Sequence, residues 1–266
     1  MDSNDFMFSS KTLGVIAVSL ALFACANSHS QDAPAAVSSA ASAAPASGPT
    51  PYPKEAKDWP GQGAIRVFPY MNDNRKSFWA KRAARQGSVA FAGDSLVGGW
   101  KTMAGDLPGI PVANLGIGSE PTRGLLFRFK EDVLDLHPKA IVLLTGSNDL
   151  SARQDIQQTR SNLVEMIAMA HRDAPGVAIV LCTLPPRDNP KSRIDPAQLI
   201  AVNKLIAGLA DESQRVFVLD LYPLLADPDG LPHAEYYVAD RLHLSPEGQK
   251  RWRDALVPIL KRLNIG

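Results

Sequence analysis

Five short apolar segments recur along the chain, with longer amphipathic stretches between them. They run continuously through apolar residues instead of alternating with polar ones, and turn-forming residues follow them. Such segments are typical of strands covered on both faces, as in a parallel sheet. The five segments are residues 88–93, 112–117, 140–146, 177–184 and 216–222.

Several of the amphipathic stretches repeat apolar residues at spacings of three and four, which is the period of one helix face. This pattern predicts helices over 159–173, 197–212 and 245–263, the last with Ser245 as its cap and Pro246 as its first residue. Strands that alternate with helices predict an α/β domain with right-handed crossovers. We predict a doubly wound, flavodoxin-like fold: a five-stranded parallel sheet with helices on both faces, in three α/β/α layers.

The first 25 residues have the features of an export signal. The apolar stretch TLGVIAVSLALFA follows Lys11, is too short to span a bilayer, and has the length of a signal-peptide core. It leads into Cys25 in a sequence that resembles the lipobox of bacterial lipoproteins, in which this cysteine carries lipid. Cleavage near Ala26 to give a secreted protein is the alternative. Translation starts at Met1 or at Met7, which begins a more typical signal.

Residues 26–53 are rich in Ala, Ser and Pro and have almost no large apolar side chains. Such a segment buries too little surface to offset its chain entropy, so it is predicted to be a disordered tether. The chain therefore divides into a signal segment (1–25), a tether (26–53) and one domain (54–266). The protein is expected in the cell envelope, as a lipoprotein, or outside the cell.

Charge and composition narrow the range of partners. Lys and Arg total 28 and Asp and Glu total 27, so the chain has no strong field that would favour nucleic acid. We expect a small-molecule or glycan partner, with a membrane contact only through lipid on Cys25; the sequence leaves the oligomeric state open. Cys182 lies in an apolar segment and is expected to be a core residue without a catalytic role.

Polar groups follow three of the predicted strands, at residues 93–95, 114–118 and 146–149. Each group by itself is explained by tight turns and helix caps. However, the carboxyl ends of neighbouring parallel strands border a common crevice in a doubly wound sheet. Three such endings therefore predict a functional site there, with Ser95 as a candidate nucleophile.

A serine nucleophile needs a base, and the base needs a group that orients it. Of the five histidines, His243 has a carboxylate at short spacing, Asp240, in a turn that leads into the last predicted helix. The other four histidines lie in the tether, before a strand, at the end of a helix or in a loop rich in proline and glycine.

Four motifs together resemble the SGNH, or GDSL, hydrolase family. They are GDSL (93–96), NLGIG (114–118), GSND (146–149) and DRLH (240–243), in the order and spacing of that family. The chain lacks the G-x-S-x-G motif of the common lipase fold, because Val97 occupies the second glycine position.

The resemblance implies a role for each matching residue. Ser95 is the expected nucleophile, His243 the general base, and Asp240 the residue that orients His243. The backbone N–H groups of Ser95 and Gly116 and the side-chain amide of Asn148 are expected to form the oxyanion hole. No metal or organic cofactor is implied.

The expected activity is hydrolysis of carboxylic esters through an acyl-serine intermediate. Residues 114–129 are similar to the acetylhydrolase-like branch of the family, which favours short acyl esters of sugars or envelope glycans. Lysophospholipid or other lipid esters are the alternative substrates. The alternative classes of protein are a noncatalytic glycan-binding lipoprotein and a metal-dependent phosphoesterase that uses Asp94, Asn148, Asp240 and His243.

Overall fold

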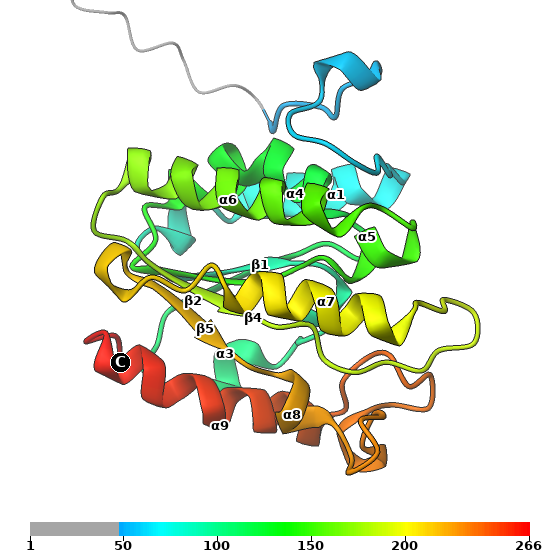
Figure 1. The fold of residues 1–266 in the computed structure, drawn as a ribbon. Helices are drawn as coiled ribbons and strands as arrows, with labels where there is room; N and C mark the ends of the chain where they lie inside the picture. Colours follow the sequence, from blue (N-terminus) through cyan, green and yellow to red (C-terminus); the bar gives the residue numbers. More distant parts are fainter. Residues whose placement is uncertain (1–47) are drawn as a thin grey trace, which may run out of the picture. The chain divides into compact units, whose positions relative to one another are not determined.

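The five apolar segments form one parallel sheet in this computed structural model, which describes residues 48–266 (Figure 1). The strand order is β2-β1-β3-β4-β5, which confirms the predicted doubly wound, flavodoxin-like order. The predicted signal peptide, Cys25 and most of the predicted tether lie outside the described residues. The strands are β1 (Val89–Gly93), β2 (Val112–Gly116), β3 (Ala140–Leu144), β4 (Ala178–Cys182) and β5 (Val216–Leu219).

The pairing register brings together the carboxyl ends of β1, β2 and β3, the three strands that polar residues follow. Gly93, the last residue of β1, pairs with Gly116 of β2 on one side and with Leu144 of β3 on the other. Because the strands are parallel, the polar residues that follow them leave the sheet at the same edge. This edge is therefore where the candidate site is assembled.

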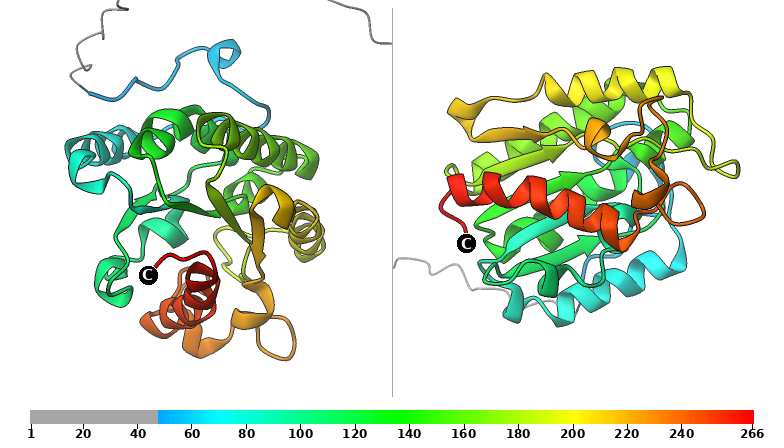
Figure 2. Two further views of the ribbon diagram at one scale, coloured as in Figure 1. Left: turned by 90° about the vertical axis from the view of Figure 1, so that its left-hand side faces the viewer. Right: turned by 90° about the horizontal axis from the view of Figure 1, so that it is seen from below.

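Helices cover both faces of the sheet in three layers (Figures 1 and 2). α1, α4 and α6 lie on one face, α3 and α9 lie on the other, and α7 packs beside α6. No helix within residues 48–266 has both the length and the apolar character needed to cross a membrane. The helices are α1 (Pro69–Ala80), α2 (Ser95–Gly98), α3 (Met103–Asp106), α4 (Thr122–Arg128), α5 (Ser147–Ser151), α6 (Ile156–Asp173), α7 (Pro196–Ala207), α8 (Tyr222–Leu225) and α9 (Pro246–Arg262).

Side-chain caps explain where the three long predicted helices begin. Asp155 accepts a hydrogen bond from Gln157 N at the start of α6, and Asp195 accepts one from Ala197 N at the start of α7, both at 2.8 Å. Ser245 caps α9, and Pro246 is its first residue, as predicted. Each cap satisfies a backbone donor that has no partner within its helix.

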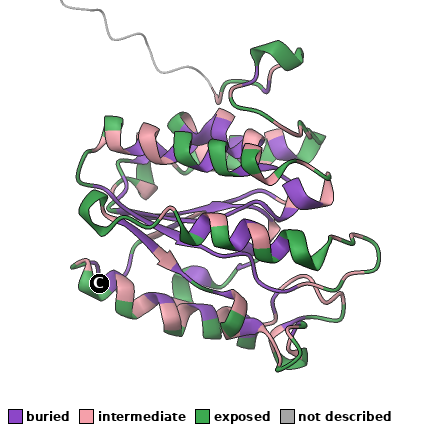
Figure 3. Cartoon of the chain, viewed as in Figure 1, coloured by how far each residue is buried: buried purple, intermediate pink, exposed green. Residues whose placement is uncertain are grey.

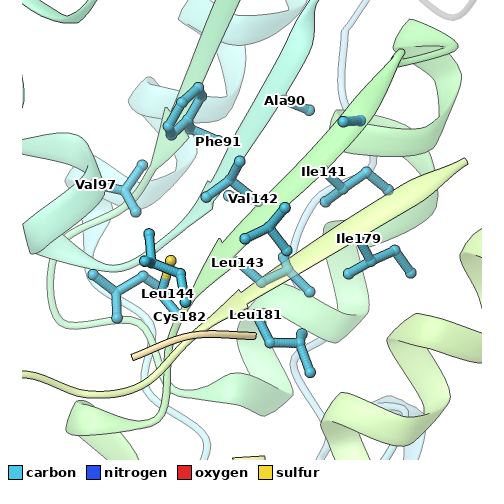
Figure 4. Close-up of a cluster of buried hydrophobic side chains, with 14 of the residues drawn as sticks. Ala90, Phe91, Val97, Ile141, Val142, Leu143, Leu144, Ile179, Leu181 and Cys182 are labelled. Atoms are coloured by element: carbon cyan, nitrogen blue, oxygen red, sulfur yellow. The ribbon is translucent and has the colours of Figure 1, made fainter. Parts of the chain in front are cut away.

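The core lies between the sheet and its two helical layers (Figures 3 and 4). Every residue of β1, β3 and β4 is buried, which is the reason that these strands are continuously apolar in the sequence. Cys182 is one of these core residues, as predicted, and its burial raises the pKa of the thiol. On the α9 face, Trp100 packs against Trp252 with ring centroids 5.2 Å apart.

The sequence composition predicted that the folded domain starts at residue 54, but in the structure it starts earlier. The Thr50 hydroxyl donates to Glu131 at 3.1 Å, and the Tyr52 hydroxyl donates to Glu120 at 2.9 Å. Tyr52 also stacks on Trp59, with ring centroids 5.5 Å apart. The predicted boundary was too late because alanine, serine and proline dominate the composition of residues 26–53, so the few side chains that contact the domain did not change it.

Candidate active site

Ser95 lies where the buried strand β1 turns abruptly into the short helix α2. Asp94 caps this helix by accepting a hydrogen bond from Leu96 N at 2.9 Å, and Ser95 is its first residue. The turn requires glycine at position 93, since a Cβ atom there would lie 2.0 Å from the carbonyl oxygen of Leu144. Close packing of β1 against β3 thus holds Ser95 at the carboxyl edge of the sheet.

Ser95, His243 and Asp240 form a hydrogen-bonded chain. His243 Nε2 lies 2.9 Å from Ser95 Oγ, and His243 Nδ1 lies 2.6 Å from Asp240 Oδ2. With the Nδ1 proton directed at the carboxylate, Nε2 is left as the acceptor for the serine proton. The arrangement has the geometry of a nucleophile, a general base and the group that orients that base.

The Asp240 carboxylate also organises its own turn. Its Oδ1 atom accepts hydrogen bonds from the backbone N–H groups of Leu242 and His243, both at 2.9 Å. Burial favours the neutral acid and thus raises the pKa of Asp240, but the hydrogen bonds from His243 and Leu242 outweigh this effect. The net result is a pKa below the ordinary value, so the carboxylate is ionised at neutral pH.

The segment after β4 holds the turn that carries Asp240 and His243. Asn189 Nδ2 donates to the carbonyl oxygen of Asp240 at 2.9 Å, and Arg241 forms an ion pair with Asp188 at 3.1 Å. Arg241 adopts φ 53°, in the left-handed region that favours glycine. These contacts join residues about fifty positions apart, and the sequence analysis did not identify Asn189 or Asp188.

The prediction that Gly116 supplies an oxyanion donor is wrong. Its backbone N–H donates instead to Asn114 Oδ1 at 3.1 Å. A Cβ atom at Gly116 would lie 2.1 Å from the backbone nitrogen of Gly98, so glycine is needed there for the packing of β2 against α2. The physical role of Gly116 is therefore close backbone contact.

The turn that follows β2 lies beside Ser95. A Cβ atom at Gly118 would lie 3.7 Å from Ser95 Cβ, and the next residue, Ser119, adopts φ 62°. Asn148, in the first turn of α5, donates from Nδ2 to the carbonyl oxygen of Glu120 at 3.3 Å. Because a primary amide has two N–H donors, Asn148 keeps one for a ligand.

Asp94 is a buried carboxyl group next to Ser95 in the chain, with 1% of its surface exposed. Burial raises its pKa to about 6, although the hydrogen bond from Leu96 N and the charges of Arg187 and His243 oppose the shift. In the unfolded chain an aspartate has a pKa of about 3.9. Between these two values the folded protein therefore binds a proton that the unfolded chain releases.

We expect Asp94 to make the protein less stable as the pH rises from about 4 to about 6. The folded state binds more protons than the unfolded state in this window, so stability falls by about 3 kcal/mol and is level above it. Asp94→Asn lacks this titration but keeps an oxygen for Leu96 N. Urea unfolding of both proteins at several pH values measures the difference, and a difference that does not change with pH contradicts the prediction.

Residues 79–251 match the GDSL-like lipase/acylhydrolase family, and the chain belongs to this family. Members of the family are ester hydrolases, so the chain is an ester hydrolase in this general sense. No curated protein matches the chain in sequence.

Several solved structures share the fold. A GDSL-like lipase from Bacteroides thetaiotaomicron is 21% identical, with a TM-score of 0.63 over 70% of this chain and 97% of that one. A lipase/acylhydrolase from Enterococcus faecalis is 22% identical, with a TM-score of 0.52 over 65% of this chain and 95% of that one. An acetyl esterase mutant with acetate ion is 16% identical, with a TM-score of 0.50 over 66% and 97%. At these identities the likeness concerns the fold alone.

Proposed function

We propose that this chain hydrolyses short-acyl carboxylic esters, such as acetyl esters of sugars or envelope glycans, by a serine mechanism. The observation that carries the mechanism is the chain of hydrogen bonds from Ser95 through His243 to Asp240, at 2.9 and 2.6 Å. The substrate class rests on the similarity of residues 114–129 to the acetylhydrolase-like branch of the family.

The reaction proceeds in two acyl transfers. Ser95 Oγ attacks the ester carbonyl carbon while His243 Nε2 takes the hydroxyl proton, and Asp240 stabilises the resulting imidazolium. The bond from the carbonyl carbon to the alcohol oxygen then breaks, and His243 gives that proton to the departing alcohol. A water molecule next attacks the acyl-serine with His243 again as base, which releases the acid and restores Ser95.

The negative charge of the tetrahedral intermediates needs donors that are in place beforehand. Ser95 N–H is one, since it lies at the start of a helix and has no partner within it. Asn148 supplies a second donor. The third donor is the backbone N–H of Ser119, in place of that of Gly116. The carbonyl oxygen of Gly118 accepts a hydrogen bond from the Tyr70 hydroxyl. Because the peptide bond between Gly118 and Ser119 is trans, the Ser119 N–H points away from Tyr70.

The positions of the acidic and histidine side chains favour this mechanism over a metal-dependent phosphoesterase. Asp94 is buried against Leu96 N, whereas both carboxylate oxygens of Asp240 face its own turn and His243. Within residues 48–266, no three His, Cys, Asp or Glu side chains converge in a way that suits a metal ion. Ser95 would also have no role in that chemistry.

The proposed site of action is the cell envelope or the exterior of the cell. This part of the proposal rests on the signal-like stretch that leads into Cys25 and on the tether that follows it. Lipid on Cys25 would anchor the domain to a membrane. Mass spectrometry of the N-terminal peptide from cells distinguishes a lipidated Cys25 from cleavage near Ala26.

Hydrolysis of p-nitrophenyl esters from acetate to palmitate tests the proposed function. We expect the highest kcat/KM with acetate and no loss of activity with a chelator. An organophosphonate is expected to stop the reaction and to add its mass to Ser95. A preference for long acyl chains would instead indicate a lipid-ester hydrolase, and the absence of both hydrolysis and labelling would indicate a noncatalytic binding protein.

A further inference from the structure

Exposed apolar side chains are concentrated in one short stretch that leads into the first turn of α1 (Pro69–Ala80). Among residues 48–266, eight large apolar side chains are exposed, and four of them lie within residues 65–70. These four are Ile65, Val67, Phe68 and Tyr70. A gathering of apolar surface on one exposed segment, unlike single scattered residues, marks a place where something binds.

This stretch is joined to the turn beside the nucleophile. The Tyr70 hydroxyl donates to the carbonyl oxygen of Gly118 at 3.1 Å, and Arg66 Nη1 donates to that of Ser119 at 3.4 Å. Gly118 is the residue whose Cβ position faces Ser95. The apolar stretch therefore lies close to Ser95, with Gly118 between Tyr70 and Ser95.

The segment before this stretch is held firmly on the domain. Gln154 Oε1 accepts from Ala64 N at 2.7 Å, and Asn162 makes two hydrogen bonds with the backbone of Gln62, at 3.1 and 2.9 Å. A surface that is fixed before binding loses little entropy when a ligand arrives. The stretch also lies outside residues 79–251, so this chain adds it to the part that matches the family.

Two aromatic rings form the centre of this surface. Phe68 and Tyr70 stack nearly in parallel, with an interplanar angle of 11° and centroids 5.6 Å apart, and about 40% of each residue is exposed. Flat aromatic faces with a polar edge suit a ring that is itself amphipathic. A pyranose is such a ring, because its C–H groups lie on its faces and its hydroxyl groups around its edge.

We propose that Phe68 and Tyr70 form a platform that binds the ring of the alcohol portion of the ester, a sugar. This inference rests on the proposed function. An acetyl group bound at Ser95 is too short to reach Phe68 and Tyr70 as well. The alcohol portion is the part that projects outward. The platform therefore determines specificity for the alcohol, and Tyr70 has a second role in positioning Gly118.

Two acetate esters of primary alcohols test the platform with the full chain: methyl 6-O-acetyl-α-D-glucopyranoside and ethyl acetate. For Phe68→Ala, we expect the ratio of kcat/KM for the glucoside to that for ethyl acetate to fall about tenfold, through KM. Phe68→Trp retains a ring and is expected to retain the ratio. Ile200→Ala, a comparably exposed apolar residue on α7, is the matched control and is expected to leave the ratio unchanged.

A ratio that is the same in wild type and Phe68→Ala overturns the platform. The platform is also overturned if Phe68→Ala changes the ratio of kcat/KM for ethyl butyrate to that for ethyl acetate but leaves the glucoside ratio unchanged. The rings would then bind the acyl chain. Saturation-transfer NMR with methyl α-D-glucopyranoside gives a readout without turnover, in Ser95→Ala with and without Phe68→Ala. A signal that depends on Phe68 supports the platform even if no ester is hydrolysed, an outcome that would refute only the proposed function.

Discussion

Ser95→Ala is expected to lower kcat for p-nitrophenyl acetate by about a million-fold, the loss seen when a serine nucleophile of this kind is removed. The substitution deletes the oxygen that lies 2.9 Å from His243 Nε2 and that, in the proposed mechanism, attacks the ester. The proposed oxyanion donors remain in place, so a small residual rate over the uncatalysed reaction is expected. Measurement needs enzyme purified away from any host esterase.

His243→Ala is expected to lower kcat by about as much, and the double variant by no more than either single variant. Nucleophile and base act as one unit, because without the base the hydroxyl is a weak nucleophile. Ile200→Ala is a suitable control for handling and folding, since it lies on α7 and takes no part in the proposed chemistry. Activity of Ser95→Ala within tenfold of wild type would rule out the serine mechanism.

Arg128→Met is expected to destabilise the protein by about 3–5 kcal/mol, because it leaves the carboxylate of Glu120 buried without its partner. Arg128 is fully buried, and its Nη2 atom lies 2.7 Å from Glu120 Oε2 and 2.8 Å from the carbonyl oxygen of Leu115. The Tyr52 hydroxyl donates to the same carboxylate. Urea unfolding followed by circular dichroism measures the loss.

An exposed ion pair provides the matched control. Arg172 lies 2.8 Å from Glu165 on the surface of α6, and pairs of this kind contribute about 0–1 kcal/mol, so Arg172→Met is expected to have little effect. The combined replacement of Arg128, Glu120 and Tyr52 by Met, Leu and Phe is expected to recover much of the loss, since no charge is then left unpaired. Equal unfolding midpoints for Arg128→Met and Arg172→Met would contradict the prediction.

The buried charges also explain why the N-terminal segment belongs to the domain. Arg75 is buried and lies 2.9 Å from Asp132, and its guanidinium also donates to the carbonyl of Thr50 and to Glu131. Burial of an arginine requires that its donors be satisfied, and residues before position 54 supply part of that satisfaction. In the sequence these charges resemble those of any solvated helix face.

Local sequence patterns determine the strands of this protein and the side-chain types of its candidate site. Strands buried on both faces must be continuously apolar, so the five strands were predictable. Their alternation with helices indicated a parallel, doubly wound sheet. Ser95 was a candidate because it follows a predicted strand, and His243 because Asp240 lies three residues before it. The role of each, and that of Asn148, came from the resemblance of four motifs to a known family. The structure brings Ser95, Asp240 and His243 into hydrogen-bond contact.

The tertiary structure alone decided which backbone groups are free and which distant segments meet. Every residue other than proline has the same N–H, so the sequence does not distinguish the N–H of Gly116, which donates to Asn114, from that of Ser119, which we propose as the oxyanion donor. Likewise, Tyr70 reaches Gly118 across 48 positions of the chain. The sequence gives the type of each side chain directly, whereas the hydrogen-bond partner of each group depends on how the whole chain packs.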